Sequence, residues 1–254
     1  MPNTLKGNPA VLCLNNVSKN FGGVVAAKDI YMQLFSGEVL GLIGPNGAGK
    51  TTLLNLITGI YMTDKGEIYL QDKEITKFPT HKRAKLGISR TFQHPRLLNR
   101  CDIRTNIFMG VDLAARRSKK NKNVEQELAL LLKCAGLDQV NLTDQVNQLA
   151  YGQQKMLEIV RAILCEPAVL LLDEPAAGLN HKEMDYIVAL IEKAVEKNIA
   201  VLLIEHAMDL VMSVCDRITV LNFGCQIATG EPKEIQMNEA VITAYLGGGA
   251  SAED

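Results

Sequence analysis

The segment from Gly44 to Thr52 constrains the fold more than any other part of the chain. It reads G-P-N-G-A-G-K-T-T and directly follows an apolar run over residues 39–43. This matches the pattern G-x-x-x-x-G-K-[ST], in which a glycine loop between a strand and a helix binds the phosphates of a nucleoside triphosphate. The loop residues are Gly44, Pro45, Asn46, Gly47, Ala48, Gly49, Lys50, Thr51 and Thr52. The segment therefore predicts an α/β nucleotide-binding fold.

The residue types in this loop suit triphosphate binding. Without side chains, Gly44, Gly47 and Gly49 let the backbone adopt positive φ and turn N–H groups toward phosphates at a helix N-terminus. Lys50 adds a positive charge, and the Thr51 hydroxyl is a hard oxygen ligand suited to Mg²⁺. A glycine turn that merely joins a strand to a helix is the structural alternative. Kinases, GTPases and motor proteins share such loops, so the segment by itself predicts only triphosphate binding.

Composition and charge argue against several other classes of protein. The chain has 254 residues, 47% of them hydrophobic, which suffices for a sizeable core in one domain with room for a subdomain. The formal net charge of −1 argues against a nucleic-acid partner. The longest apolar runs, such as residues 199–204, are far shorter than the ~20 residues that span a bilayer. Because the first residues also lack the apolar core of a secretory signal, we expect a cytosolic protein.

The cysteines do not form a recognisable framework. The six of them are scattered without C-x-x-C spacing, at positions 13, 101, 134, 165, 215 and 225. This distribution argues against zinc sites and against disulfide bridges. We expect reduced and mostly buried thiols.

Strand and helix patterns alternate on both sides of the phosphate loop. Residues 11–17 and 24–35 predict an antiparallel pair of strands, with Phe21 in the loop between them. An aromatic side chain at this place either stacks on a flat purine ring or packs on its neighbours. We expect four further elements before Gln93: a helix that ends at Gly59, a strand over 67–70, a helix over 79–86 and a strand over 88–92.

The pattern changes to helices between residues 102 and 148. Residues 103–109 and 124–135 both have helical periodicity, and Gly136 provides a C-terminal stop. The basic run over 116–122 between them is either a solvated loop or a contact for an anionic surface. The sequence therefore predicts a helical insert within an α/β domain.

Two motifs after the insert carry chemistry. The segment Leu149-Ala150-Tyr151-Gly152-Gln153 opens an amphipathic helix, and a glycine-bearing helix N-terminus can bind an anion. A continuously apolar strand from residue 168 then ends in Asp173 and Glu174. In a phosphate-loop ATPase, an aspartate at the end of a neighbouring strand helps to hold Mg²⁺, and the glutamate beside it can polarise the attacking water. The alternative is an acidic pair that only ends a strand.

The last third of the chain supplies one more polar candidate. A buried strand over 201–205 ends at His206, where strand ends face a ligand, although a histidine there is often structural. Helical periodicity follows over 208–214. Strands over 217–222 and 225–229 precede a small helical pattern over 232–246, and the glycines at 247–249 predict a disordered tail.

The order of these motifs resembles the ATP-binding subunit of ATP-binding cassette (ABC) transporters along nearly the whole chain. The resemblance implies a P-loop NTPase fold with a RecA-like core, an antiparallel β subdomain and a helical signature subdomain, and it implies ATP and Mg²⁺ as ligands. It assigns adenine stacking to Phe21, contact with Mg²⁺ and water to Gln93, and the γ-phosphate switch to His206. It also reads Leu149–Gln153 as the cassette signature, Asp173 as a magnesium ligand, Glu174 as the catalytic glutamate, and Ala177–Asn180 as the loop that crosses a cassette dimer.

Several segments are similar, more narrowly, to the high-affinity branched-chain amino acid importers. They are T-F-Q-H at 91–94, L-A-Y-G-Q-Q at 149–154, D-E-P-A-A-G-L-N at 173–180, I-E-H at 204–206 and A-Y-L-G at 244–247. The resemblance implies a second cassette, identical or different, two membrane permeases, a periplasmic solute-binding protein and a peripheral place on the cytoplasmic face of the inner membrane. Urea and amide importers share much of the pattern, so they stay an alternative.

The resemblance also implies a division of the chain and leaves a rival class. It implies one cassette over 8–246, with the core at 8–95 and 165–246, the helical subdomain at 96–164 and a flexible tail at 247–254. The rival is a soluble cassette ATPase that acts in DNA repair or on the ribosome. Repair cassettes carry a long coiled coil before the signature, whereas only about 100 residues without sustained heptads intervene here. A nucleotide-binding subunit without hydrolysis conflicts with the intact Lys50, Asp173, Glu174 and His206.

Two motifs depart from the commoner cassette pattern. The signature usually reads L-S-G-G-Q, and the cross-dimer loop usually ends in aspartate, whereas this chain has L-A-Y-G-Q and A-G-L-N. Ala150 lacks the serine hydroxyl, whose loss costs roughly 0.5 to 1.5 kcal/mol if nothing replaces it. Asn180 keeps hydrogen-bonding capacity without the negative charge. We therefore expect lower intrinsic hydrolysis.

Overall fold

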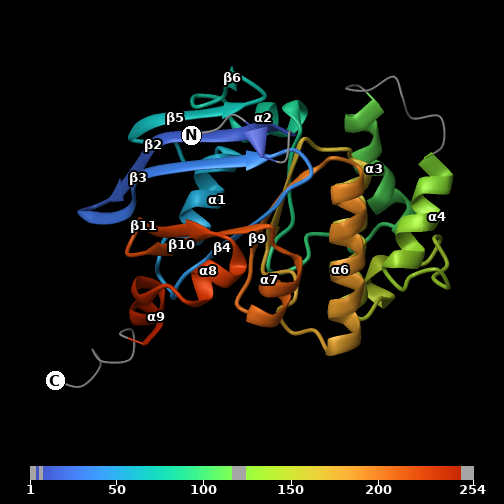
Figure 1. The fold of residues 1–254 in the computed structure, drawn as a ribbon. Helices are drawn as coiled ribbons and strands as arrows, with labels where there is room; N and C mark the ends of the chain where they lie inside the picture. Colours follow the sequence, from blue (N-terminus) through green and yellow to red (C-terminus); the bar gives the residue numbers. More distant parts are fainter. Residues whose placement is uncertain (1–3, 6–7, 116–123, 247–254) are drawn as a thin grey trace.

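In the part of the chain that the structure describes, one mixed sheet of eleven strands runs through the molecule (Figure 1). The computed structural model describes residues 4–5, 8–115 and 124–246. Along the main path the strand order is β6-β5-β2-β3-β11-β10-β4-β9-β8-β7, and β1 pairs with β2 beside this path. The strands are β1 (Thr4–Leu5), β2 (Asn8–Phe21), β3 (Val24–Phe35), β4 (Val39–Ile43), β5 (Lys65–Leu70), β6 (Lys73–Glu74), β7 (Ile88–Arg90), β8 (Val169–Asp173), β9 (Ala200–Ile204), β10 (Arg217–Asn222) and β11 (Cys225–Gly230).

Five neighbouring strands form the parallel part of the sheet. β10, β4, β9, β8 and β7 pair in parallel in that order. Every residue of β4, β8 and β9 is buried, as expected of strands that are covered on both faces. Their near-continuous apolar sequences are therefore a direct consequence of their central place.

The antiparallel part is longer than the sequence predicts. β2 and β3 pair up to Phe21 and Val24, so that only Gly22 and Gly23 remain in the turn, with φ of 53° and 95°. A two-residue hairpin turn with positive φ at both positions follows the right-handed twist of its strands, and glycine allows it. Phe21 consequently ends a strand, and its expected place in a loop between residues 18 and 23 is wrong.

Helices cover both faces of the parallel strands. Figure 1 places α1 between the antiparallel strands and the parallel ones, and gathers α3, α4 and α6 at the other side of the molecule. The helices are α1 (Lys50–Thr58), α2 (Thr80–Leu86), α3 (Ile103–Ala115), α4 (Val124–Cys134), the single 3₁₀ turn η1 (Val146–Gln148), α5 (Tyr151–Leu164), α6 (His181–Glu196), α7 (Met208–Val214), α8 (Pro232–Gln236) and α9 (Glu239–Leu246).

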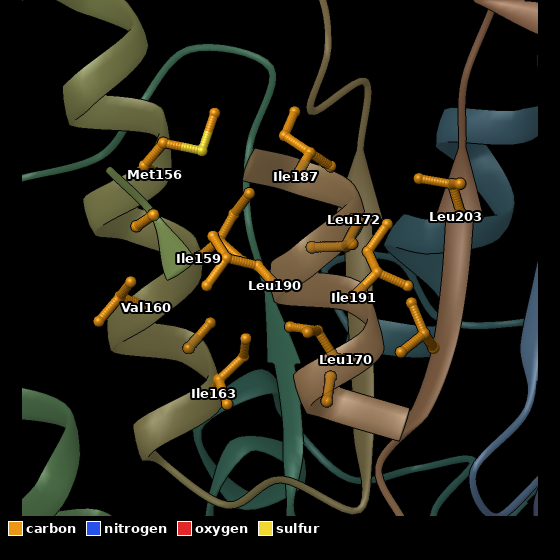
Figure 2. Close-up of a cluster of buried hydrophobic side chains, with 14 of the residues drawn as sticks. Met156, Ile159, Val160, Ile163, Leu170, Leu172, Ile187, Leu190, Ile191 and Leu203 are labelled. Carbon is orange, nitrogen blue, oxygen red and sulfur yellow. The ribbon is translucent and has the colours of Figure 1, made fainter. Parts of the chain in front are cut away.

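Two hydrophobic cores lie on opposite faces of these strands. Because side chains alternate along a strand, Leu171 and Leu202 face α1 and the antiparallel strands, whereas Leu172 and Leu203 face α5 and α6. Figure 2 shows the second core, in which side chains of α5 and α6 meet those of β8 and β9. Residues of α3 and α4, such as Ile107 and Leu131, belong to the same core. The helical insert therefore packs continuously onto the sheet.

Several expectations about single elements need correction. The first insert helix, α3, continues to Ala115 instead of ending near residue 109. The segment expected as one helical pattern over 232–246 forms two helices, because α8 ends at Gln236 and the chain turns before α9. None of the six cysteines, all of which lie in the described residues, forms a disulfide, but only Cys165 and Cys215 are buried, so the expectation of mostly buried thiols is wrong. The basic run at 116–122 and the glycines at 247–249 lie outside the described residues.

Within residues 4–5, 8–115 and 124–246, no helix combines the length and the apolar character that crossing a bilayer requires.

Candidate nucleotide site

The polar candidates meet at one edge of the parallel strands. The phosphate loop follows β4, the acidic pair ends β8, and His206 follows β9. β9 lies between β4 and β8, and Asp173 is paired directly with Ile204. Because the carboxyl ends of parallel strands share one edge, three segments that are far apart in the sequence lie side by side here.

Glycines in the phosphate loop are required by close backbone contacts as well as by φ. A Cβ on Gly44 would lie 2.1 Å from the carbonyl oxygen of Leu221, and one on Gly49 would lie 2.3 Å from that of Ala26. The φ angles of these two glycines are 151° and 101°. Since Gly49 has no side chain to cap α1, the first N–H groups of that helix remain for a ligand.

Lys50 lies within the phosphate loop. Its ammonium donates to the carbonyl oxygens of Gly44 at 2.6 Å and Pro45 at 3.0 Å, and the residue is 6% exposed. Burial lowers the pKa of Lys50, while the nearby carboxylates of Glu174 and Asp173 act in the opposite direction. The positive charge of Lys50 therefore lies within the loop and close to the acidic pair Asp173 and Glu174.

Glu174 is the centre of a polar cluster. Gln93 Nε2 donates to Glu174 Oε2 at 2.8 Å, and His206 Nε2 lies 3.2 Å from Glu174 Oε1, a contact that becomes an ion pair when the imidazole is protonated. The Glu174 backbone has a φ of 48°, which is uncommon for a residue with a side chain, and its N–H donates to Ile204 O. The structure therefore brings the three predicted catalytic residues into one cluster.

Asp173 has a partner that the sequence reading did not assign. Its Oδ2 accepts from Arg90 Nη2 at 2.7 Å, and both side chains are nearly buried. Arg90 Nη1 also donates to Asn55 Oδ1 at 2.7 Å and so connects the carboxylate to α1. In the sequence, this pair is indicated by the basic residue Arg90 at the end of β7, the strand next to β8.

Phe21 lies at the tip of the β2–β3 hairpin. Its ring meets that of Tyr61 edge to face, with centroids 5.1 Å apart, and 41% of Phe21 remains exposed. The same hairpin reaches the phosphate loop through Ala26, next to Gly49. Phe21 thus packs on a neighbour and keeps an open surface, so both sequence readings for it are compatible with this geometry.

The segment from Leu149 to Gln153 lies apart from the phosphate loop. Ala150 is the residue before α5, and its N–H donates to Gln153 Oε1 at 3.0 Å. Ala150, Gly152 and Gln153 line a cavity together with Asn180, whereas Gly44, Pro45, Asn46 and Ala48 line a different one together with His206. The structure therefore separates this segment from the phosphate loop, although both belong to the predicted site.

Asn180 directly precedes α6 and caps it. Its Oδ1 accepts from the N–H of Glu183 at 3.1 Å, and Glu183 Oε2 accepts from the N–H of Asn180 at 2.9 Å. This reciprocal arrangement is a capping box. A Cβ on Gly152 would lie 2.1 Å from Glu183 Oε1, so the cap and the segment at 149–153 are in close contact.

Comparison with known proteins identifies the family. A family model described as ABC transporter matches residues 27–177, which is more than half of the chain. The chain belongs to this family. As an ABC cassette it is an ATP-binding, ATP-hydrolysing subunit, and the α/β phosphate-loop fold expected from the sequence is confirmed.

Individual relatives agree over nearly the whole length. The cassette is 42% identical to the high-affinity branched-chain amino acid transport ATP-binding protein BraF of Pseudomonas aeruginosa, over 93% of this chain and 98% of that protein. The corresponding protein LivG of Escherichia coli K12 is 39% identical with the same coverage. A crystal structure of an ABC transporter cassette in its ADP conformation superimposes with a TM-score of 0.80 at 30% identity, over 94% of this chain and 99% of that one.

Buried charges of the cassette fix the loops around Glu174, and the sequence reading missed them. Lys155 Nζ donates to three backbone oxygens, those of Glu174, Pro175 and Ala177, at 2.9 to 3.1 Å. Glu205 accepts from the N–H of Ala176 at 2.6 Å and from that of His206 at 2.9 Å. Charged residues within otherwise apolar patterns were the only signal, because most of their partners are backbone atoms of another segment of the chain.

Glu158 does the same for the segment around Gln93. Its carboxylate accepts from the N–H groups of Arg96 at 2.9 Å and Phe92 at 3.2 Å, on either side of Gln93. Glu158 is 2% exposed, and burial raises its pKa above the ordinary value despite these hydrogen bonds.

Alanine substitutions at two glycines of the phosphate loop should lower the free energy of unfolding by different amounts. Gly44→Ala forces a Cβ onto a backbone oxygen, whereas the space around Gly47, with φ of 77°, is open. Gly47→Ala should lower the free energy of unfolding by about 1–2 kcal/mol from its φ alone, and Gly44→Ala should lower it by at least about 2 kcal/mol more. Urea denaturation of the two variants measures the difference. Equal costs would contradict the close contact with Leu221.

The raised pKa of Glu158 predicts a pH-dependent difference in stability. Because the folded state binds this proton more tightly, its contribution is fully present below the ordinary pKa of 4.5 and is lost as pH rises through the raised folded-state pKa. The free energy of unfolding of the wild type, minus that of Glu158→Gln, should therefore be largest at acid pH and should decrease from about pH 4.5 upward. Denaturation series at several pH values measure it, and a difference that rises with pH would refute the assignment.

Proposed function

We propose that this cassette is the ATP-hydrolysing subunit of an importer of branched-chain amino acids. Full-length relatives carry that name, and a model described as branched-chain amino acid ATP-binding cassette transporter matches residues 225–251. The observation that carries the catalytic part is the position of the Glu174 carboxylate between Gln93 and His206.

Glu174 acts as the general base in this proposal. Its carboxylate takes a proton from the water that attacks the γ-phosphate, and a positioned base of this kind typically contributes 10²- to 10⁴-fold to the rate. Gln93 orients the carboxylate and the water, while His206 contacts the γ-phosphate from the adjacent strand end. The contacts of Lys155 and Glu205 support this geometry, because they hold the backbone on both sides of Glu174.

The phosphate loop and Phe21 hold the nucleotide. The N–H groups from Gly47 to Thr52 surround the phosphates, and Lys50, which donates to carbonyl oxygens of its own loop here, turns to the outer phosphates. Phe21 stacks on adenine with the part of its ring that Tyr61 leaves exposed.

The donor atoms at this edge fit a magnesium ion. The hydroxyl of Thr51, the amide oxygen of Gln93 and the carboxylate of Asp173 are hard oxygen ligands, and Mg²⁺ usually takes one or two protein carboxylates together with phosphate oxygens and water. Among the described residues, no three acidic, histidine or cysteine side chains converge on a metal position, so phosphates and water would supply most ligands. A bound Mg²⁺ neutralises charge on the phosphates.

Leu149 to Gln153 act on a different nucleotide, the one bound to a second cassette. Two cassettes would face each other, with the phosphate loop of each opposite the signature of the other. The separation of the two segments within one chain supports this arrangement, because neither cavity alone contains both. Purification of the intact assembly shows whether the second cassette is a second copy of this chain or a different chain.

The proposal extends to the assembly around the cassette. Residues 96–164 form the helical subdomain and the rest of 8–246 forms the core, with a permease helix docked near Gln93 between them. Closure of the cassettes on ATP would open the permeases to alternate faces of the membrane. The cassettes lie on the cytoplasmic face, and a solute-binding protein on the other side delivers the amino acid.

Removal of the proposed base tests the catalytic part. Glu174→Gln keeps the size and a hydrogen-bonding oxygen but cannot accept the proton, so phosphate release by the purified cassette should fall by at least about 100-fold while ATP binding is retained. The exposed Glu196, which among the described residues pairs with Lys193 on its own helix, provides the control Glu196→Gln with ordinary turnover. Normal turnover by Glu174→Gln would sink the assignment.

Solute uptake tests the transport part. Proteoliposomes that contain this cassette with its co-purified permeases should accumulate labelled leucine, in the presence of the solute-binding protein and ATP on the cassette side. The same vesicles with Glu174→Gln should not. Uptake of labelled urea in place of leucine would contradict the assignment of branched-chain amino acids as the solute and leave the ATPase assignment intact.

A further inference from the structure

The third residue of the signature segment contacts the hydrolysis cluster of its own chain. Tyr151 lies in the first turn of α5, and its hydroxyl donates to the backbone oxygen of Gln93 at 3.0 Å. In the commoner signature this position is a glycine, which has no side chain that could make the bond. The contact is therefore a property of the sequence L-A-Y-G-Q.

Gln93 is held at both of its ends. Its carbonyl accepts from Tyr151, and its side-chain amide donates to Glu174 Oε2 at 2.8 Å. We infer that Tyr151 is a positioning residue that holds Gln93 against Glu174 and thereby ties the signature turn to the hydrolysis site of the same chain. This inference rests on the proposed roles of Gln93 and Glu174.

The surroundings of Gln93 explain why its carbonyl needs an anchor. Glu158 fixes the N–H groups of Phe92 and Arg96 at the two sides of this residue. Tyr151 adds the bond between these two anchors, at the residue whose side chain reaches Glu174. Without the hydroxyl, the Gln93 peptide group would be free to rotate, and the Gln93 side-chain amide would no longer be directed at Glu174.

Lys155 gives α5 a second connection to the same cluster. It lies four residues after Tyr151, hence on the same face of the helix, and its Nζ is 5.5 Å from the centre of the Tyr151 ring. Through the backbone oxygens of Glu174 and Ala177, Lys155 holds the loop that carries the carboxylate. The first turns of α5 therefore hold Gln93 with one side chain and the Glu174 backbone with another.

This arrangement gives the signature a role in its own site. When the signature binds the nucleotide of the second cassette, any rotation of α5 moves Tyr151 and Lys155 together, and with them both partners of the Gln93–Glu174 bond. Occupancy of one site would thus set the alignment of the other. The coupling acts on hydrolysis and leaves the phosphate loop, on the far side of β9, unchanged.

The hydroxyl is tested by comparing Tyr151→Phe with Tyr151→Ala. Loss of one hydrogen bond corresponds to about a twofold to tenfold effect, so Tyr151→Phe should lower kcat by about that factor, and its kcat should resemble that of Tyr151→Ala. The KM for ATP, the Kd for a fluorescent ATP analogue and the melting temperature of Tyr151→Phe should stay at wild-type values. Tyr69→Phe is the matched control, because it also removes a hydroxyl bond, to Glu67 at 2.7 Å, on a strand away from the site.

The outcomes separate the inference from the proposed function. A purely structural role of the ring predicts that Tyr151→Phe restores wild-type kcat and that only Tyr151→Ala is impaired, which would overturn the inference. A parallel loss of kcat, nucleotide affinity and melting temperature in Tyr151→Phe would overturn it as well. If the wild type releases no phosphate, or if Glu174→Gln does not reduce the release, the proposed function itself fails.

Discussion

The parallel pairing of β4, β9 and β8 is the constraint on which the site depends. Their register brings the phosphate loop, Glu174 and His206 to one edge, although more than 100 residues of chain separate the loop from Glu174 and from His206. The strands can lie together only because both of their faces are covered by apolar side chains, one face by α1 and the other by α5 and α6. Chemistry at this edge is thus a consequence of burial on both sides of the sheet.

Much of this arrangement could be predicted from the sequence, because its signals are local. A glycine loop after an apolar strand and an acidic pair after another specify element type and position without knowledge of distant contacts. The length of β2 was not predictable in the same way, since Ser18 to Phe21 become a strand through pairing with β3 and β5. Lys155, Glu158 and Glu205 were missed because each binds backbone atoms of another segment, and no spacing in the sequence encodes such partners.

These three buried charges explain how a polar site can be rigid inside an apolar core. Each side chain is 4% exposed or less, and burying a charge is costly unless hydrogen bonds compensate it. Here the compensation comes from peptide groups of the loops that carry Gln93, Glu174 and His206. Displacing one of these loops would leave a buried charge unsatisfied, so the positions of the loops are coupled to the stability of the whole domain.

The cap of α6 shows that fold stability does not account for one departure from the family pattern. Asn180 satisfies the N–H of Glu183, but an aspartate at that place would accept the same bond and would also gain from the positive end of the helix dipole. Folding therefore tolerates asparagine or aspartate at this position, with a slight preference for aspartate. The charge at the entrance of this helix is consequently a property that a single substitution can alter without rebuilding the scaffold.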